Sequence, residues 1–296
     1  DFRTYEGRHR AAANLLEHGI DHLVVIGGDG SLSGTNEFRG EWAQHVAELA
    51  AEGVISPETA AAHPALIIVG LVGSIDNDLV GTDMTIGADT ALHRILDAID
   101  QLTSTAASHQ RTFVVEVMGR HCGYLPLMAA VAGGADYVFT PEDPAGPGWQ
   151  DDLAEHLRLG REAGRRESIV LVAEGAHDRD GNELSTQLIA DTIQERTGED
   201  ARVTILGHVQ RGGTPSAYDR WMSTLLGYAA VQEILESTAE DEPVILGVRR
   251  NRITRIPLMK AVHDTRAVKD LIAAGDYAAA QASRGSSFSS MVGINQ

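Results

Sequence analysis

The chain has 296 residues, of which 42 are acidic and 24 are basic, and its formal net charge is -18. The charged residues are dispersed and no basic tract occurs, so we do not expect a nucleic-acid partner. Because single hydrophobic cores stop growing near ~250 to 300 residues, a chain of this length is expected to form two lobes.

The sequence contains neither a membrane or secretion signal nor the cysteines needed for an intramolecular disulfide. No apolar run approaches the ~18 residues that a membrane-spanning helix needs, and residues 1–30 lack the layout of a signal peptide. Cys122 is the only cysteine, so an intramolecular disulfide is impossible. We therefore expect a cytoplasmic protein that does not associate with a membrane.

Strands and helices alternate along the chain, which predicts an α/β fold with mostly parallel, doubly wound sheets. The apolar residues between 88 and 102 recur at i, i+3 and i+4 spacing, as is typical of an amphipathic helix. In chain order we expect a helix at 8–17, a strand at 23–26, a helix at 37–52, a strand at 66–72, a helix at 88–102, a strand at 112–117, a helix at 124–131, a strand at 137–139, a further helix, a strand at 169–173, a helix at 185–197, a strand at 202–206, a helix from 216, and a strand at 244–248 before a helical tail.

A glycine-rich segment, GGDGS at 27–31, follows the first predicted strand. Gly28 and Gly30 lack a Cβ, so the backbone there can approach a phosphate and direct its N–H groups toward it, ahead of a helix N-terminus that favours anions. Asp29 would repel a bare phosphate, which makes sense if a cation such as Mg²⁺ lies between them. A structural turn capped by an aspartate is the alternative, and this segment alone does not decide between the two.

The segment GSIDND at 73–78 follows the second predicted strand and carries the most informative pair of residues. Asp76 and Asp78 lie beyond the carboxyl end of a strand, where ligands bind in open α/β sheets. One carboxylate of such a pair can accept a proton while the other holds a cation or orients the site. A capped turn is the alternative interpretation.

Other polar residues lie just past later predicted strands, namely Arg120, Glu174, His208 and Arg211. The carboxyl ends of parallel strands gather at one edge of a sheet, so these side chains are expected to converge. Arginine pairs bidentately with phosphate, glutamate suits sugar hydroxyls, and histidine can donate to a phosphate oxygen. Glu174 could instead pair with Arg179, and His208 could be a structural histidine.

The positions of the lysines exclude two phosphate-binding motifs. Lys260 and Lys269 are the only lysines and lie far from the glycine-rich segments, which excludes a P-loop and the strand lysine of protein kinases. A dinucleotide-binding fingerprint is also incomplete, because Ser33 stands where glycine is required. Any phosphate must therefore be held by arginine, histidine, backbone or metal.

Taken together, these segments resemble ATP-dependent 6-phosphofructokinases over essentially the whole chain. The resemblance implies two Rossmann-like lobes, and the insertion at 37–63 makes the chain similar to the amino-terminal, catalytic half of the longer animal and fungal type. The segments that carry it are GGDGS at 27–31, GSIDND at 73–78, SHQR at 108–111, MGRHCG at 118–123, VAEG at 172–175 and LGHVQRGG at 206–213.

The resemblance implies a nucleotide-binding lobe at 1–87 plus 210–256 and a sugar-phosphate-binding lobe at 88–209 plus 257–296. It also implies that the chain begins after the family's first strand and is a fragment. The expected activity is transfer of a phosphoryl group from MgATP to the 1-hydroxyl of fructose 6-phosphate in glycolysis. The carboxy-terminal halves of these enzymes serve regulation, so a non-catalytic, effector-binding module is the alternative.

The same resemblance assigns roles to individual residues. Asp76 would be the general base, Arg120 would line the sugar and the transferring phosphoryl group, and Asp29 would help to hold Mg²⁺. Gly30 and Gly73 would favour ATP over pyrophosphate as the donor. The ATP phosphates would lie against Gly28, Asp29, Gly30 and Ser31, and the substrate against Ser74, Ile75, Asp76, Met118, Gly119, Arg120, Glu174, His208, Val209, Gln210 and Arg211.

In the family, the arginines that match Arg111 and Arg202 reach into the site of a neighbouring subunit. The resemblance therefore implies a homo-oligomer, usually a tetramer, and an active site that needs at least two subunits.

Overall fold

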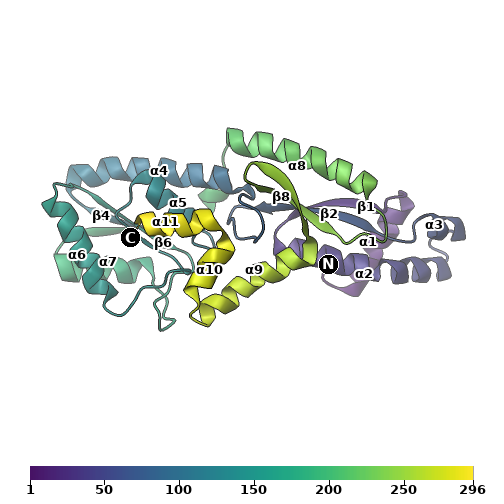
Figure 1. The fold of residues 1–296 in the computed structure, drawn as a ribbon, viewed down its shortest axis with the longest axis horizontal. Helices are drawn as coiled ribbons and strands as arrows, with labels where there is room; N and C mark the ends of the chain where they lie inside the picture. The colour runs from purple at the N-terminus through teal and green to yellow at the C-terminus, as the bar shows by residue number, and fades with distance from the viewer. Residues whose placement is uncertain (296) are drawn as a thin grey trace. The chain divides into compact units, whose positions relative to one another are not determined.

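The computed structural model describes residues 1–295, which separate into two compact units (Figure 1). Among these described residues, no helix combines the length and the apolar character that crossing a membrane demands. The first unit comprises Asp1–Gly73, Gly81–Asp83 and Trp221–Thr265, and the second comprises Ser74–Val80, Met84–Arg220 and the residues from Arg266 onward.

The first unit contributes four strands to a five-stranded sheet, and three of these four are parallel and one is antiparallel. The strands lie in the order β1 (His22–Gly27), β2 (Ile67–Ser74), β8 (Val244–Arg249) and β9 (Arg252–Pro257), and only β9 runs antiparallel to its neighbour. In Figure 1, α8 (Ala217–Glu236) lies along one side of this sheet, and α1 (Tyr5–Glu17) and α2 (Asp29–Ala51) lie on the other.

Strand β9 was not predicted from the sequence. It pairs with β8 through a two-residue turn at Arg250 and Asn251, which have φ values of 50° and 61°. Two consecutive left-handed residues are the geometry of a type I′ hairpin turn, whose usual sequence is Asn-Gly or Asp-Gly. The pair Arg-Asn lacks that signal.

Helix α2 begins at Asp29, whereas the sequence pattern predicted a start at 37, so the predicted start was wrong. Its polar first turns are stabilised by hydroxyl groups that bond back into the helix: Ser33 Oγ donates to the Asp29 carbonyl at 2.6 Å and Thr35 Oγ1 to the Ser31 carbonyl at 2.9 Å. Burial of Leu32 adds an apolar anchor to this turn. Such local bonds and tertiary burial outweigh the low helix propensity of the segment.

The second unit contains a fully parallel sheet that is covered on both faces. Its strands lie in the order β5 (Tyr137–Phe139), β6 (Ser168–Ala173), β4 (Thr112–Val117) and β7 (Ala201–Ile205). All six residues of β6 are buried, as expected for a strand with helices on both sides.

Alternation along the strands of this sheet separates two apolar layers, because successive side chains point to opposite faces. Val114, Val170 and Val172 pack with α6 (Trp149–Glu162) and α7 (Thr186–Thr197). Val115, Val117 and Leu171 pack with α4 (Ala88–His109) and α5 (Tyr124–Gly133). The prediction of a doubly wound, mostly parallel α/β fold is confirmed. The remaining elements are α3 (Pro57–Ala62), β3 (Ile86–Gly87), a 3₁₀ turn η1 (Gly207–Arg211), α9 (Leu258–Ala273), α10 (Tyr277–Arg284) and α11 (Ser286–Asn295).

The two units differ at their edges from the lobes that the resemblance implied, since residues 74–80, 84–87 and 210–220 belong to the second unit and 257–265 to the first. Asp219 explains part of this difference. Its buried carboxylate accepts hydrogen bonds from the backbone N–H of Gly87 at 2.8 Å and of Thr90 at 2.9 Å, and from the Thr90 hydroxyl. These bonds tie the start of α8 to the start of α4.

Candidate active site

The loop after β2 places Asp76 by means of its own polar side chains. Asn77 adopts a left-handed φ of 51°, and its Oδ1 accepts a 2.8 Å hydrogen bond from the Thr85 N–H. Ser74 Oγ donates to Asp78 Oδ1 at 3.1 Å and accepts from the Asp76 N–H at 3.3 Å. The asparagine turn fixes the loop without occupying the Asp76 carboxylate.

Asp76 is a buried carboxylate that retains hydrogen-bonding capacity. It is 5% exposed, its Oδ2 lies 3.6 Å from Arg120 Nε, and its buried Oδ1 has no hydrogen-bond partner among the described residues. The pKa of Asp76 is raised to about 6, chiefly by burial and then by the charge of Asp78, while Arg120 and Arg211 act in the opposite direction. A carboxylate with these properties is suited to accept a proton near neutral pH.

Arg120 follows β4 in a conformation that two neighbouring glycines permit. Its φ is 52°, and its backbone N–H donates to Glu174 Oε2 at 3.0 Å. A Cβ added to Gly119, whose φ is 148°, would lie 2.3 Å from the Cys122 carbonyl oxygen, and one added to Gly175 would lie 2.3 Å from the Arg120 carbonyl oxygen. The left-handed arginine is therefore held by close backbone packing, a kind of strain that concentrates at functional sites.

The 3₁₀ turn η1 after β7 carries two exposed polar side chains and one buried one. His208 and Arg211 are exposed, whereas Gln210 is 1% exposed. Gln210 Oε1 accepts from the Met118 N–H at 3.1 Å, and its Nε2 donates to the Gly207 carbonyl at 2.9 Å. The amide of Gln210 is thus engaged in joining the ends of β4 and β7.

Two further predicted contacts differ in character. Val209 is 68% exposed, whereas Ile75 packs against the apolar layer formed with α4 and α5. Ile75 is only partly buried in this position.

Arg111 and Arg202 lie at the amino-terminal ends of β4 and β7, whereas Arg120 and His208 follow the carboxyl ends of these strands. Both pair with Asp200, through Arg111 Nε at 2.8 Å and Arg202 Nη2 at 3.0 Å. Because β4 rises by about 3.3 Å per residue over Thr112–Val117, roughly 20 Å of strand separates Arg111 from the end of β4 that leads to Arg120, beside Asp76. The fold does not bring these two arginines to the Asp76 carboxylate of their own chain.

The glycine-rich segment belongs to the first unit. Gly28 is the N-cap of α2, and Asp29, Gly30 and Ser31 form the first turn of that helix. A Cβ added at Gly28 or Gly30 would meet no atom within 4 Å, so open space lies beside this backbone. The helix N-terminus and the single Asp29 carboxylate fit a phosphate with Mg²⁺, which takes one or two carboxylates together with phosphate oxygens and water.

Arg284 and Glu142 were not identified from the sequence. Glu142 is fully buried and accepts from Arg284 Nε at 2.9 Å, and Arg284 also donates to the carbonyl oxygens of Asp78 at 2.6 Å and His121 at 3.0 Å. These bonds hold the Asp76 loop and the Arg120 turn from α10. An arginine in a helical tail, far along the chain from its partners, offers no local signal of this role.

Comparison with known proteins gives consistent results. A family model described as Phosphofructokinase matches residues 1–234. The liver-type ATP-dependent 6-phosphofructokinase of Homo sapiens is 52% identical over 287 residues, which cover 97% of this chain and 37% of that protein. ATP-dependent 6-phosphofructokinase 1 of Caenorhabditis elegans is 50% identical over 288 residues, which cover 97% of this chain and 35% of that protein.

A solved structure of phosphofructokinase from Saccharomyces cerevisiae matches with a TM-score of 0.97 and 49% identity, covering 99% of this chain and 39% of that one. The chain thus spans little more than a third of the length of the curated relatives described above, at 37% and 35%. The motifs that first suggested the family, the fold and the match over residues 1–234 agree, and the chain belongs to the phosphofructokinase family.

Proposed function

We propose that the protein containing this chain transfers a phosphoryl group from MgATP to the 1-hydroxyl of fructose 6-phosphate, giving fructose 1,6-bisphosphate and ADP. The relatives are named ATP-dependent 6-phosphofructokinases, which supports this activity. The observation that carries the catalytic assignment is the Asp76 carboxylate, which is buried, has a raised pKa and leaves Oδ1 without a hydrogen-bond partner within residues 1–295.

In this proposal Asp76 accepts the proton of the sugar 1-hydroxyl as that oxygen attacks the phosphoryl group. The carboxylate can do so because its raised pKa lies near the operating pH, where a general base is most effective. Arg120, whose guanidinium is exposed beside Asp76, stabilises negative charge on the transferring group.

Residues at the ends of β6 and β7 bind the sugar phosphate. His208 and Arg211 hold the 6-phosphate from η1, and Glu174 accepts hydrogen bonds from sugar hydroxyls. The exposure of all three side chains supports these roles. Gln210 acts through the backbone of Met118 and Gly207 and serves as a positioning residue.

The first unit holds the nucleotide. The open backbone at Gly28 and Gly30 and the N-terminus of α2 receive the phosphates, and Asp29 holds Mg²⁺. Bound there, Mg²⁺ supplies neutralisation of phosphate charge, which is the main requirement of phosphoryl transfer.

We further propose a homo-oligomer, a tetramer, in which Arg111 and Arg202 serve the site of a neighbouring subunit. Their position at the strand end opposite to Asp76 supports this arrangement.

A coupled assay on the full-length protein tests the activity by comparing ATP with pyrophosphate as the donor. We expect turnover with ATP and fructose 6-phosphate and none with pyrophosphate. Turnover with pyrophosphate alone would overturn the donor assignment. Binding of sugar phosphate without turnover from either donor would instead favour the regulatory, effector-binding alternative.

A further inference from the structure

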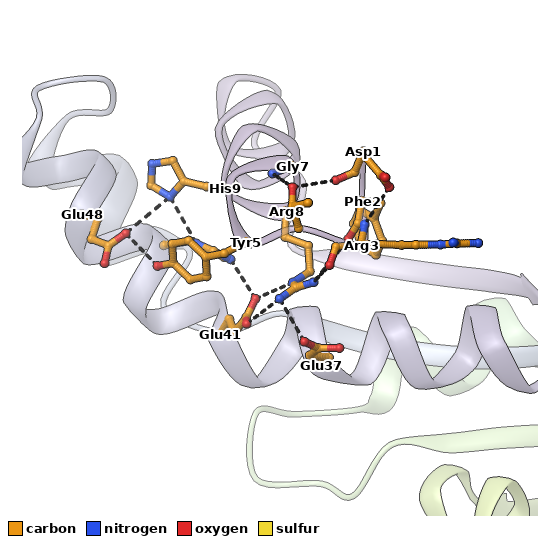
Figure 2. A network of polar contacts seen from close by, with 12 residues as sticks. Asp1, Phe2, Arg3, Tyr5, Gly7, Arg8, His9, Glu37, Glu41 and Glu48 are labelled. Carbon is orange, nitrogen blue, oxygen red and sulfur yellow. Dashed lines mark hydrogen bonds and ion pairs between the residues drawn. The ribbon is translucent and has the colours of Figure 1, made fainter.

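Helices α1 and α2 of the first unit carry a cluster of metal-ligating side chains that the proposed reaction does not use. His9 Nδ1 lies 3.2 Å from His45 Nδ1 and 3.6 Å from Glu48 Oε2. The ligand atoms of these three residues all lie within 4.8 Å of one another. Figure 2 shows His9, on one helix, directed toward Glu48 on the other.

These separations suit a single ion. A tetrahedral Zn²⁺ has bonds of about 2.0 to 2.1 Å to histidine nitrogen and to carboxylate oxygen, which places neighbouring ligand atoms roughly 3.3 Å apart. The two separations given above, 3.2 Å and 3.6 Å, lie within a few tenths of an ångström of that value. We propose that His9 Nδ1, His45 Nδ1 and Glu48 Oε2 bind a transition-metal ion of the Zn²⁺ type and so link α1 to α2.

The Glu48 carboxylate is held in place by neighbouring side chains. The Tyr5 hydroxyl donates to Oε2 at 2.7 Å, and Gln44 Nε2 donates to Oε1 at 2.8 Å. Tyr5 also packs against the His45 ring, with centroids 4.6 Å apart. Ligands fixed in this way lose little conformational entropy when the ion binds.

A carboxylate also lies behind each imidazole. Glu41 Oε2 is 3.3 Å from His45 Nε2, although the pair does not meet hydrogen-bond geometry, and Glu52 Oε2 is 3.7 Å from His9 Nε2. Histidine ligands in metal sites commonly donate their second ring N–H to a carboxylate, which fixes the ring and strengthens the ligand. Both rings therefore present Nδ1 to the cluster and Nε2 to an acid.

Glu41 is itself fixed by Arg8. The guanidinium is buried and donates to both carboxylate oxygens, through Nε at 2.6 Å and Nη2 at 2.8 Å, as the dashed lines in Figure 2 show. The acid behind His45 therefore has a set position rather than a mobile one.

The chemistry of the cluster selects the class of ion. Without a metal, the two facing nitrogens must share one proton, and two charged rings would repel each other. His45 is fully buried, so its ring has a fixed position between the two helices. Imidazole together with carboxylate suits Zn²⁺, Co²⁺ or Ni²⁺, whereas Mg²⁺ prefers oxygen ligands. The Mg²⁺ that accompanies ATP should not compete.

Calorimetric titration of the metal-stripped, full-length protein with Zn²⁺, alongside visible absorption spectra with Co²⁺, tests the proposal. We expect one equivalent of ion per chain that His9→Gln and His45→Gln each abolish, together with a tetrahedral Co²⁺ absorption that disappears in both variants. Tyr5→Phe, which removes the hydrogen bond to Glu48 Oε2 but keeps all three ligands, should weaken affinity by about tenfold. His18→Gln is the matched control, because His18 is an exposed histidine at the end of the same helix.

The proposal is overturned if both ligand variants bind as many Zn²⁺ ions as the unaltered protein, or if excess Mg²⁺ displaces the ion. A second readout is the thermal unfolding midpoint, which Zn²⁺ should raise in the unaltered protein and in His18→Gln but not in His9→Gln. If His45→Gln does not fold because its ring is fully buried, His9→Gln, whose side chain is 19% exposed, decides the question.

Discussion

Nε of Arg120 lies 3.6 Å from Oδ2 of Asp76, which is close enough for attraction between charges but beyond the range of a strong hydrogen bond. The arginine therefore lowers the pKa of Asp76 only partly, and burial keeps that pKa at about 6. Asp76 remains able to accept a proton from a ligand while a positive charge stays beside it.

Replacing Asp76 with asparagine should lower turnover by at least ~10²-fold, as expected for loss of a general base. Turnover is measured with the coupled assay on the full-length protein. A loss smaller than ~10-fold would rule out Asp76 as the base.

Folding of the Asp76→Asn variant is checked by urea denaturation. Because folding raises the pKa of Asp76, the ionised carboxylate destabilises the folded state at pH values above that pKa. The free energy of unfolding of the variant should therefore be higher than that of the unaltered protein by on the order of 1 to 3 kcal/mol at pH 7.

The pH profile of kcat/KM should rise through an acidic limb near pH 6, because the base must lose its proton before it can act and its pKa is about 6. Asp78 is the first charge that raises this pKa, so Asp78→Asn should move the limb to lower pH. Asp97→Asn, which alters an exposed carboxylate paired with Arg94, is the control and should leave it unchanged. A limb that moves upward in Asp78→Asn would contradict the electrostatic account.

Gly175→Ala should destabilise the protein by about 1 to 3 kcal/mol, the usual cost of forcing an extra methyl group into packed structure. Its Cβ would lie 2.3 Å from the Arg120 carbonyl oxygen, so the left-handed turn must shift and turnover should fall as well. Gly160→Ala, within α6, meets only side-chain atoms at ordinary contact distances, Arg165 Cδ at 3.5 Å and Asp136 Oδ1 at 3.9 Å, and should be neutral or stabilising. Equal unfolding midpoints for the two variants would show that the turn is not tightly packed.

Arg284→Met should destabilise the second unit by about 3 to 5 kcal/mol, because it leaves the fully buried Glu142 carboxylate without its charge partner. Adding Glu142→Gln should recover part of that loss. Arg255→Met removes a pair between an exposed arginine and the partly buried Glu233, and should cost less than the loss of Arg284. The free energies of unfolding from denaturant titrations give the comparison, and a similar loss from both arginines would argue against a special role for Arg284.

Arg111→Ala and Arg202→Ala should each weaken sugar-phosphate affinity if these residues serve a neighbouring subunit. Mixing Asp76→Asn subunits with Arg202→Ala subunits should then restore activity, because some sites would combine an intact Asp76 with an intact Arg202. Activity that stays at the level of the separate variants, in mixed oligomers verified by mass, would assign each site to a single chain.

Much of this fold could be predicted from the sequence, and the exceptions have physical causes. Strands Thr112–Val117 and Tyr137–Phe139 match the predicted bounds, because short buried apolar runs between turn residues leave little choice of register. The hairpin strand β9 was missed because Arg250 and Asn251 adopt left-handed conformations in its turn, and this pair of residue types is not a usual signal for such a turn. The start of α2 was misplaced because hydroxyl bonds within the helix are invisible to propensity.

The loop positions of the candidate site were predictable, whereas its internal contacts were not. Asp76 and Arg120 each follow a strand in a recognisable motif, and the fold places them beside each other. The bonds from Arg284 to the Asp78 and His121 carbonyls depend on how a distant helix packs. No local pattern encodes a contact of that kind.

The amide of Gln210 couples two loops of the second unit. One side chain joins the Met118 N–H, two residues before Arg120, to the turn that carries His208 and Arg211. A phosphate that draws this turn inward would also pull on the backbone that orients the Arg120 guanidinium. Phosphate binding at the end of β7 would thereby affect the position of Arg120 at the end of β4 through the hydrogen bonds of one side chain.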